Sequence, residues 1–177
     1  KDFLDVISAN KALKLITSFR ATVRTEGIPL DDACGRILAR DVVAAEAIPQ
    51  FDRSVVDGFA VKAKDTLGAK EHSPVPLKHQ GEVRVAEEPS IALQEGGCVY
   101  VNTGSMIPDG ADAILMQEYA RPALDIVEVT RTVRKGENIF FRGEDIAAGS
   151  RVLKKGKKLS FADVGVLAAL GSFMVPV

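Results

Sequence analysis

Residues 49–61 read PQFDRSVVDGFAV, a polar loop that runs directly into an apolar segment. Pro49 favours an extended backbone at the start of the loop, and Asp57-Gly58 predicts a tight turn. The run that begins at Phe59 has the composition of a strand. A polar loop mounted on a rigid strand is a common setting for a functional site. Taken alone, however, these residues are better explained as a polar turn between two strands.

The composition is that of an ordinary folded protein. The chain has 177 residues, which suits one or two domains, and 46% of them are hydrophobic, enough for a core. A net charge of -1 offers no broad basic field and argues against nucleic acid as the main partner. We find no signal peptide and no apolar run long enough to cross a bilayer, so we expect no membrane association and a cytoplasmic location.

Cysteine and histidine chemistry has no support in the sequence. Cys34 and Cys98 are too few and too far apart for a disulfide scaffold or a zinc site, and we expect both to be buried. His72 and His79 lie in a polar region that we interpret as an exposed loop, with no cysteine or carboxylate at ligand spacing.

Helical patterns lie at the two ends of the chain, and strand patterns lie between them. Ser8 is a suitable N-cap for a first helix that ends near Arg20. Ser160 and Asp163 have the spacing of a capping box, for a second helix that Gly171 ends. Strands are expected at 59–62, 75–78, 83–86, 98–102, 113–117 and 126–129.

This order of patterns predicts an α+β fold that is mostly β. We expect two domains. A discontinuous helical and extended domain comprises residues 1–45 and 146–177. Residues 46–145 form an inserted β-rich domain, resembling a sandwich or a barrel.

The candidate functional groups are oxygen atoms and arginines. The carboxylates at loop or strand ends are Asp57, Glu118, Glu144 and Asp145. Such hard oxygens suit Mg²⁺, which takes one or two carboxylates and completes its shell with water and phosphate. Hydroxyl, amide and backbone donors for an oxyanion are offered by Ser54, Asn102, Thr103 and Gly104. The arginines able to neutralise an oxyanion are Arg53, Arg134 and Arg142. Each acid taken singly is better explained as a turn former or a cap.

Two further stretches repeat the arrangement of acids and glycine at the end of an apolar segment. Residues 101–118 read VNTGSMIPDGADAILMQE, and residues 134–146 read RKGENIFFRGEDI. Together with residues 49–61 they resemble, in order, three patterns of the molybdopterin molybdenumtransferase family, which includes the MoeA proteins and the gephyrin E domain. Those patterns are P-x-F-D-x-S-x-x-D-G-(F/Y)-A, T-G-x-x-x-P-x-G-A-D-x-(V/I)-x-x-x-E and G-x-N-I-x-x-x-G-E-D. Three ordered matches are far more specific than one motif.

The resemblance implies an enzyme of molybdenum cofactor biosynthesis. The family inserts molybdenum from molybdate into adenylylated molybdopterin, uses a divalent cation such as Mg²⁺, and releases AMP. The elongated domain of residues 1–45 and 146–177 is then expected to help form a homodimer. The motifs imply catalytic roles for Asp57, Thr103 and Asp145, substrate binding by Ser54, Asn102, Gly104 and Arg142, and metal binding by Asp57, Glu118 and Glu144.

The resemblance covers nearly the whole chain but only the N-terminal part of the family pattern. The family continues beyond the equivalent of Val177 into a pterin-binding domain with a T-G-D-E-L motif and then a small β domain. We therefore expect this chain to carry half of a site and to be inactive alone. The alternative is a gephyrin-like dimerising scaffold without catalysis, and a stand-alone β-rich binding domain is a third interpretation. The retained Asp57, Thr103 and Asp145 favour the enzyme.

Overall fold

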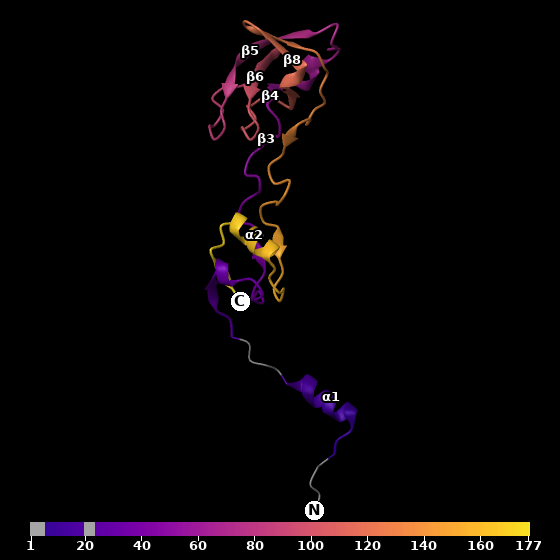
Figure 1. The fold of residues 1–177 in the computed structure, drawn as a ribbon, viewed down its shortest axis with the longest axis vertical. Coiled ribbons are helices and arrows are strands. Elements are labelled where there is room, and N and C mark those ends of the chain that lie inside the picture. The colour runs from indigo at the N-terminus through magenta and orange to yellow at the C-terminus, as the bar shows by residue number, and fades with distance from the viewer. Residues whose placement is uncertain (1–5, 20–23) are drawn as a thin grey trace, which may run out of the picture. The chain divides into compact units, whose positions relative to one another are not determined.

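The computed structural model describes residues 6–19 and 24–177, which form two compact units (Figure 1). Unit 1 comprises Lys1–Asp41 and Leu153–Val177, and unit 2 comprises Val42–Val152. Unit 2 is thus one continuous stretch lying within the sequence of unit 1. The domain assignment made from the sequence stays a prediction.

Unit 1 contains both of the α-helices found in the described residues. The helix α1 begins after Ser8, whose Oγ accepts a hydrogen bond from Lys11 N (3.3 Å), so the predicted N-cap is confirmed. Its expected end at Arg20 lies outside the described residues. The other elements of unit 1 include a two-stranded antiparallel sheet, β1 with β12. The elements are α1 (Ala9–Ser18), β1 (Gly27–Pro29), the 3₁₀ turn η1 (Leu30–Asp32), α2 (Phe161–Ala169) and β12 (Met174–Pro176).

The helix α2 begins with the predicted capping box. Asp163 N donates to Ser160 Oγ (3.3 Å), and Ser160 N donates to the Asp163 carboxylate (2.9 Å). The same carboxylate lies 2.5 Å from Lys157 Nζ. The hydrogen bond from Lys157, followed by those from Ser160, lowers the pKa of Asp163 from 3.8 to about 2. The charge therefore remains on the first turn of the helix, where the helix dipole favours an anion.

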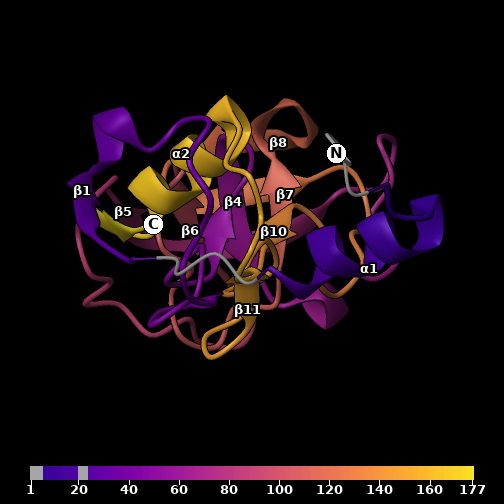
Figure 2. The ribbon, with the colours of Figure 1, turned by 90° about the horizontal axis from the view of Figure 1, so that it is seen from below.

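Unit 2 is dominated by a six-stranded sheet in the order β7-β4-β6-β5-β9-β8, which curls into a half barrel (Figures 1 and 2). All neighbours are antiparallel except β5 and β6. The strands are β4 (Gly58–Val61), β5 (Val75–Val83), β6 (Gly97–Val101), β7 (Ala113–Met116), β8 (Ala120–Ala123) and β9 (Ile126–Val129). Two short 3₁₀ turns accompany them, η2 (Ala63–Thr66) and η3 (Gln117–Tyr119).

The strand β4, which lies between β7 and β6, is buried on both faces, which explains its uninterrupted apolar sequence. Phe59 and Val61 enter one hydrophobic cluster, and Ala60, which points the opposite way, enters another. A strand with two buried faces needs apolar residues at every position rather than at alternate positions. The loop of residues 49–57 is therefore joined to a fully buried strand of the sheet.

The structure corrects the predicted strands at β5. The sequence suggested two strands, 75–78 and 83–86, but Val75–Val83 is one strand with a register irregularity between His79 and Glu82. Gly81 lies in this irregularity, and a Cβ there would lie 2.6 Å from the side chain of Ile91. A glycine that interrupts a strand pattern commonly marks such a bulge rather than an end. The strand β8 was not predicted, because Pro122 weakens its strand signal.

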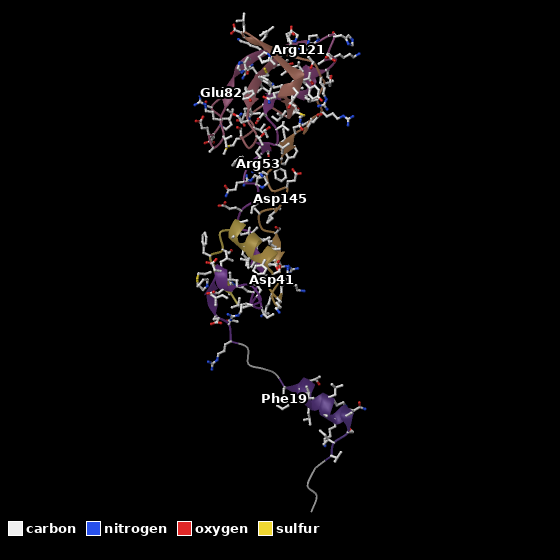
Figure 3. The ribbon with its side chains drawn as sticks, in the orientation of Figure 1. Phe19, Asp41, Arg53, Glu82, Arg121 and Asp145 are labelled. Carbon is white, nitrogen blue, oxygen red and sulfur yellow. The ribbon has the colours of Figure 1, made fainter. Side chains whose placement is uncertain are left out.

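A stalk, defined as residues 42–56 and 138–152, completes unit 2. Its short sheets pair β2 (Val42–Val43) with β11 (Arg151–Leu153), and β3 (Arg53–Ser54) with β10 (Ile139–Phe140). Ile48 and Ile146 form a further antiparallel bridge. Along the stalk, Arg53 lies nearer the six-stranded sheet than Asp145 (Figure 3).

The cysteines and histidines differ partly from expectation. Cys98 is fully buried, and burial raises the pKa of its thiol to about 12, but Cys34 is only half-buried. Both histidines are exposed, as predicted, although His79 lies in β5 rather than in a loop. In the described part of the chain, no helix has the length and hydropathy needed to cross a membrane.

Candidate functional site

The sheet topology brings three predicted site segments to one edge. β4 is antiparallel to both of its neighbours, β6 and β7, so the start of β4 lies beside the ends of the other two strands. Gly58 accordingly pairs with Val101 on one side and with Met116 on the other. The residues next to these positions, Asp57 and Asn102, are therefore neighbours despite their distance in sequence.

Asp57 and Thr103 form the most defined contact of this edge. One carboxylate oxygen of Asp57, Oδ1, accepts hydrogen bonds from Thr103 N (2.7 Å) and Thr103 Oγ1 (2.9 Å). Gln117 N donates to the Asp57 carbonyl (3.1 Å), which ties the same residue to the end of β7. Asp57 is half-buried and Thr103 is exposed, so the pair is accessible from solvent.

These hydrogen bonds lower the pKa of Asp57. The backbone N–H of Thr103 lowers the pKa of the carboxyl group most, the Thr103 hydroxyl lowers it further, and the Asn102 side chain adds a smaller contribution. Partial burial opposes these effects. The result is a negative charge held in a fixed orientation, suitable for a cation or for orienting water.

Gly58 determines how closely β7 can approach this site. A Cβ on Gly58 would lie 2.0 Å from the Leu115 carbonyl oxygen, a distance that no side chain tolerates. Only glycine therefore lets the backbones of β4 and β7 meet next to Asp57. The Asp-Gly pair, expected from the sequence to be a turn, is thus also a packing requirement.

Ser54 and Gly104 link the stalk to this edge. Gly104 N donates to Ser54 O (2.8 Å), and Gly104 has φ +88°, which favours glycine. Ser54 is buried, and its hydroxyl donates to Val56 O (2.5 Å). The Ser54 side chain is therefore used within the protein and is not presented to a ligand in this structure.

Glu118 lies in η3, immediately after the residue that bonds to the Asp57 backbone. Its side chain is exposed. Glu118 therefore belongs to the same edge of the sheet as Asp57, although no direct contact joins the two carboxylates.

The remaining predicted residues form a second group, on the stalk. Arg142 N donates to Asp52 Oδ1 (2.7 Å), and Phe141 N donates to Glu144 Oε2 (2.9 Å). Asp145 N donates to Ile48 O (3.1 Å), beside the Ile48–Ile146 bridge. The side chains of Arg142, Glu144 and Asp145 are all exposed. The structure therefore separates the predicted residues into the Asp57 edge and the stalk group.

The predicted metal ligands do not form one site. Among the described residues, no group of three or more His, Cys, Asp or Glu side chains is arranged to hold a metal ion. Asp57 and Glu118 lie on the sheet edge, whereas Glu144 lies on the stalk and binds its own turn. The residues fit Mg²⁺ only in its common role, with a single carboxylate such as Asp57 and the remaining ligands supplied by phosphate and water.

A hollow of about 360 Å³ in unit 2 was not expected from the sequence. Its lining combines apolar and charged side chains, of which only Arg142 had been considered as a site residue. The lining residues are Gln50, Phe51, Asp52, Glu88, Pro89, Met106, Ile107, Asp109 and Arg142. Asp52 and Asp109 were not among the predicted site residues, and no local pattern indicates that their loops meet.

Comparison with known proteins identifies the relatives of this chain. Residues 7–171 match the family described as MoeA N-terminal region (domain I and II). The molybdopterin molybdenumtransferase of Staphylococcus epidermidis is 36% identical over 172 residues, covering 93% of this chain and 39% of the relative. That of Bacillus subtilis is 35% identical over 178 residues, covering 97% of this chain and 41% of the relative. The chain thus spans about two fifths of the length of these curated relatives.

Solved structures show the same fold. The crystal structure of a molybdopterin biosynthesis MoeA protein from Pyrococcus horikoshii matches with a TM-score of 0.87 and 41% identity, over 98% of this chain and 46% of that chain. A second structure of a MoeA protein, with the source organism given as Pyrococcus horikosii, matches with a TM-score of 0.88 and 36% identity, over 98% of this chain and 44% of that chain. The predicted α+β, mostly β fold class is confirmed.

Proposed function

This chain belongs to the family of the MoeA N-terminal region, and on that premise we propose that it is part of a molybdopterin molybdenumtransferase. Its proposed reaction inserts molybdenum from molybdate into adenylylated molybdopterin and releases AMP. Molybdate and the adenylylated pterin are the substrates. The double hydrogen bond from Thr103 to Asp57 is the observation that carries the proposal, because it prepares a fixed, accessible anion at a strand end.

The lowered pKa of Asp57 argues against a role as a proton acceptor. A carboxylate with a lowered pKa is a weak proton acceptor, so Asp57 is better suited to orient than to deprotonate. We place Asp57 as the group that orients the attacking water or ligates the divalent cation. In the reaction, the water oxygen bonds to the phosphorus of the adenylyl group, the anhydride P–O bond breaks, and AMP and the molybdopterin phosphate separate, with the proton of the water passing to solvent. A bound cation would supply neutralisation of the phosphate charge.

The other predicted residues take supporting roles in this proposal. Thr103 holds the Asp57 carboxylate in place through two hydrogen bonds, and the Asn102 side chain also lowers the pKa of that carboxylate. Gly104 joins the site loop to the stalk through its hydrogen bond to Ser54. Asp145 and Arg142, exposed on the stalk, are proposed to face the part of the cleft that the remaining length of the relatives would supply. We also propose that the whole protein is a homodimer, which sedimentation velocity would test.

The proposal is tested with a chimera in which this chain replaces the matching N-terminal region of the Bacillus subtilis relative. The chimera is expressed in a strain that lacks its own molybdenumtransferase, and the molybdenum content of a molybdenum-dependent enzyme is measured. We expect the chimera to restore that content, and its Asp57→Asn variant to fail. A dimeric, folded chimera that restores nothing would contradict the proposal and favour a scaffold.

A further inference from the structure

A second hollow in unit 2, of about 690 Å³, has a basic lining. We call it the basic hollow, and it is formed by Arg131, Thr132, Arg134, Lys135, Gly136 and Glu137. Its volume lies within the range of about 300–1,000 Å³ that is common for small-molecule sites. Only Arg134 among these residues was considered as a candidate anion ligand from the sequence, and the proposed function has not used it.

The backbone of the basic hollow is fixed at both ends. Thr132 Oγ1 donates to Thr66 O (2.8 Å), and Val133 N donates to the fully buried Thr66 Oγ1 (3.1 Å). Gly136 N donates to Asp112 O (2.7 Å), which holds the other end against the start of β7. Residues 134 and 135 are therefore presented on a turn whose two flanks are anchored.

The charges of the basic hollow do not cancel. The single acid, Glu137, lies 2.7 Å from Arg131 through Oε1 and accepts a hydrogen bond from Arg134 N (2.9 Å) through Oε2. Both of its oxygens are thus engaged, and its charge is balanced by Arg131, which also stacks over the Tyr119 ring (5.0 Å). Within residues 6–19 and 24–177, the exposed side chains of Arg134 and Lys135 form no ion pair.

The basic hollow also adjoins the Asp57 edge. Arg131 stacks on Tyr119 of η3, and Gln117 of the same turn donates to the Asp57 carbonyl. Ile114 N donates to Glu137 O (2.9 Å), so the hollow borders the first part of β7.

We propose that the basic hollow binds the phosphate of a nucleoside monophosphate, with Arg134 and Lys135 as the principal ligands and Arg131 as a pre-oriented third cation. Two unpaired cations complement a phosphate dianion, and an arginine guanidinium can bind two of its oxygens together. The inference rests on the proposed function, since that reaction releases AMP. It goes further by assigning the phosphate to residues outside the predicted site.

Isothermal titration of the chain with AMP tests this inference without any turnover. The double variant Arg134→Gln/Lys135→Gln is expected to bind AMP about a hundredfold more weakly, because losing each charge-assisted contact weakens binding by about tenfold. The matched control is Lys154→Gln/Lys155→Gln, which removes two exposed lysine charges from unit 1. The control is expected to bind AMP like the unaltered chain.

Competition identifies the group that is recognised. Inorganic phosphate is expected to displace AMP, whereas adenosine without phosphate is not. Failure of the unaltered chain to bind AMP, equal weakening in the control, or displacement by adenosine alone would each overturn the inference. Two results together would separate this inference from the proposed function. If the chimera restores molybdenum insertion but Arg134→Gln/Lys135→Gln leaves AMP binding unchanged, this inference is wrong and the proposed function stands.

Discussion

At the scale of single residues, Thr103 lowers the pKa of Asp57 through two donors, and the contributions of the two donors can be separated. Thr103→Val removes the hydroxyl and keeps the backbone N–H, which is the larger cause of the lowered pKa. We therefore expect the pKa of Asp57 to rise in Thr103→Val but to remain below its ordinary value of 3.8. The measurement is a carbon-13 NMR titration of the Asp57 carboxyl group.

The same hydrogen bonds determine how the stability of the folded chain changes with pH. Because folding lowers the pKa of Asp57, its contribution to stability is present above pH 3.8 and is lost as the pH falls through the lower, folded value. Thr130→Val is the control, since it removes a hydroxyl that donates to Tyr119 O and not to Asp57. An Asp57 pKa that is equal in the Thr103→Val and unaltered chains would contradict this account of the site.

At the scale of elements, the approach of β7 to β4 depends on Gly58. In Gly58→Ala the new Cβ would overlap the Leu115 carbonyl, so the two strands must separate. We expect a loss of about 3 kcal/mol in the free energy of unfolding, at the upper end of the cost of overpacking. Denaturant unfolding followed by amide exchange in β4 and β7 measures it.

The control for this change is Gly165→Ala in α2. A Cβ at Gly165 meets no atom within 4 Å, and alanine favours a helix by up to about 1 kcal/mol over glycine. We therefore expect Gly165→Ala to stabilise unit 1 slightly. If Gly58→Ala changed the stability no more than this, the close approach of β4 and β7 would not be a requirement of the fold.

Elements defined by local chemistry could be predicted from the sequence. Ser160 and Asp163 are three residues apart, and that spacing alone specifies the capping box at the start of α2. The strand β4 was recognised from its apolar run. The continuity of β5 through Gly81 was not, because a glycine in a strand pattern can mark either an end or a bulge, and the close approach of Ile91 that favours glycine there comes from ten residues away. Short stalk strands such as β3 have no periodicity to detect and form only because their partners lie opposite.

The site was predictable in its residues but not in its arrangement. The carboxylate and donor types of Asp57, Asn102 and Thr103 follow from the motifs, and their contact follows from the antiparallel pairing of β4 with β6. That pairing joins residues more than forty positions apart, which no local pattern reveals. The same limit explains why Glu144 was grouped with Asp57 as a metal ligand, although it lies on the stalk.

At the scale of the whole molecule, each unit is closed by segments that are far apart in the sequence. β1 pairs with β12 in unit 1, and β3 pairs with β10 in unit 2. The continuous unit 2 carries the Asp57 edge, the stalk group and the basic hollow. It therefore contains every residue that we assign to the proposed reaction, and the remaining length of the relatives is expected to complete the cleft.

The central claim is that this chain contributes Asp57 to the release of AMP during molybdenum insertion. The most direct measurement is the single-turnover rate of AMP release from adenylylated molybdopterin, with molybdate, by the chimera with the Bacillus subtilis relative. We predict that Asp57→Asn lowers this rate by about a hundredfold, the usual effect of removing one pre-oriented electrostatic group. Asp125→Asn, the same change in the exposed turn between β8 and β9, is predicted to leave it unchanged. Equal rates in the two variants would contradict the claim.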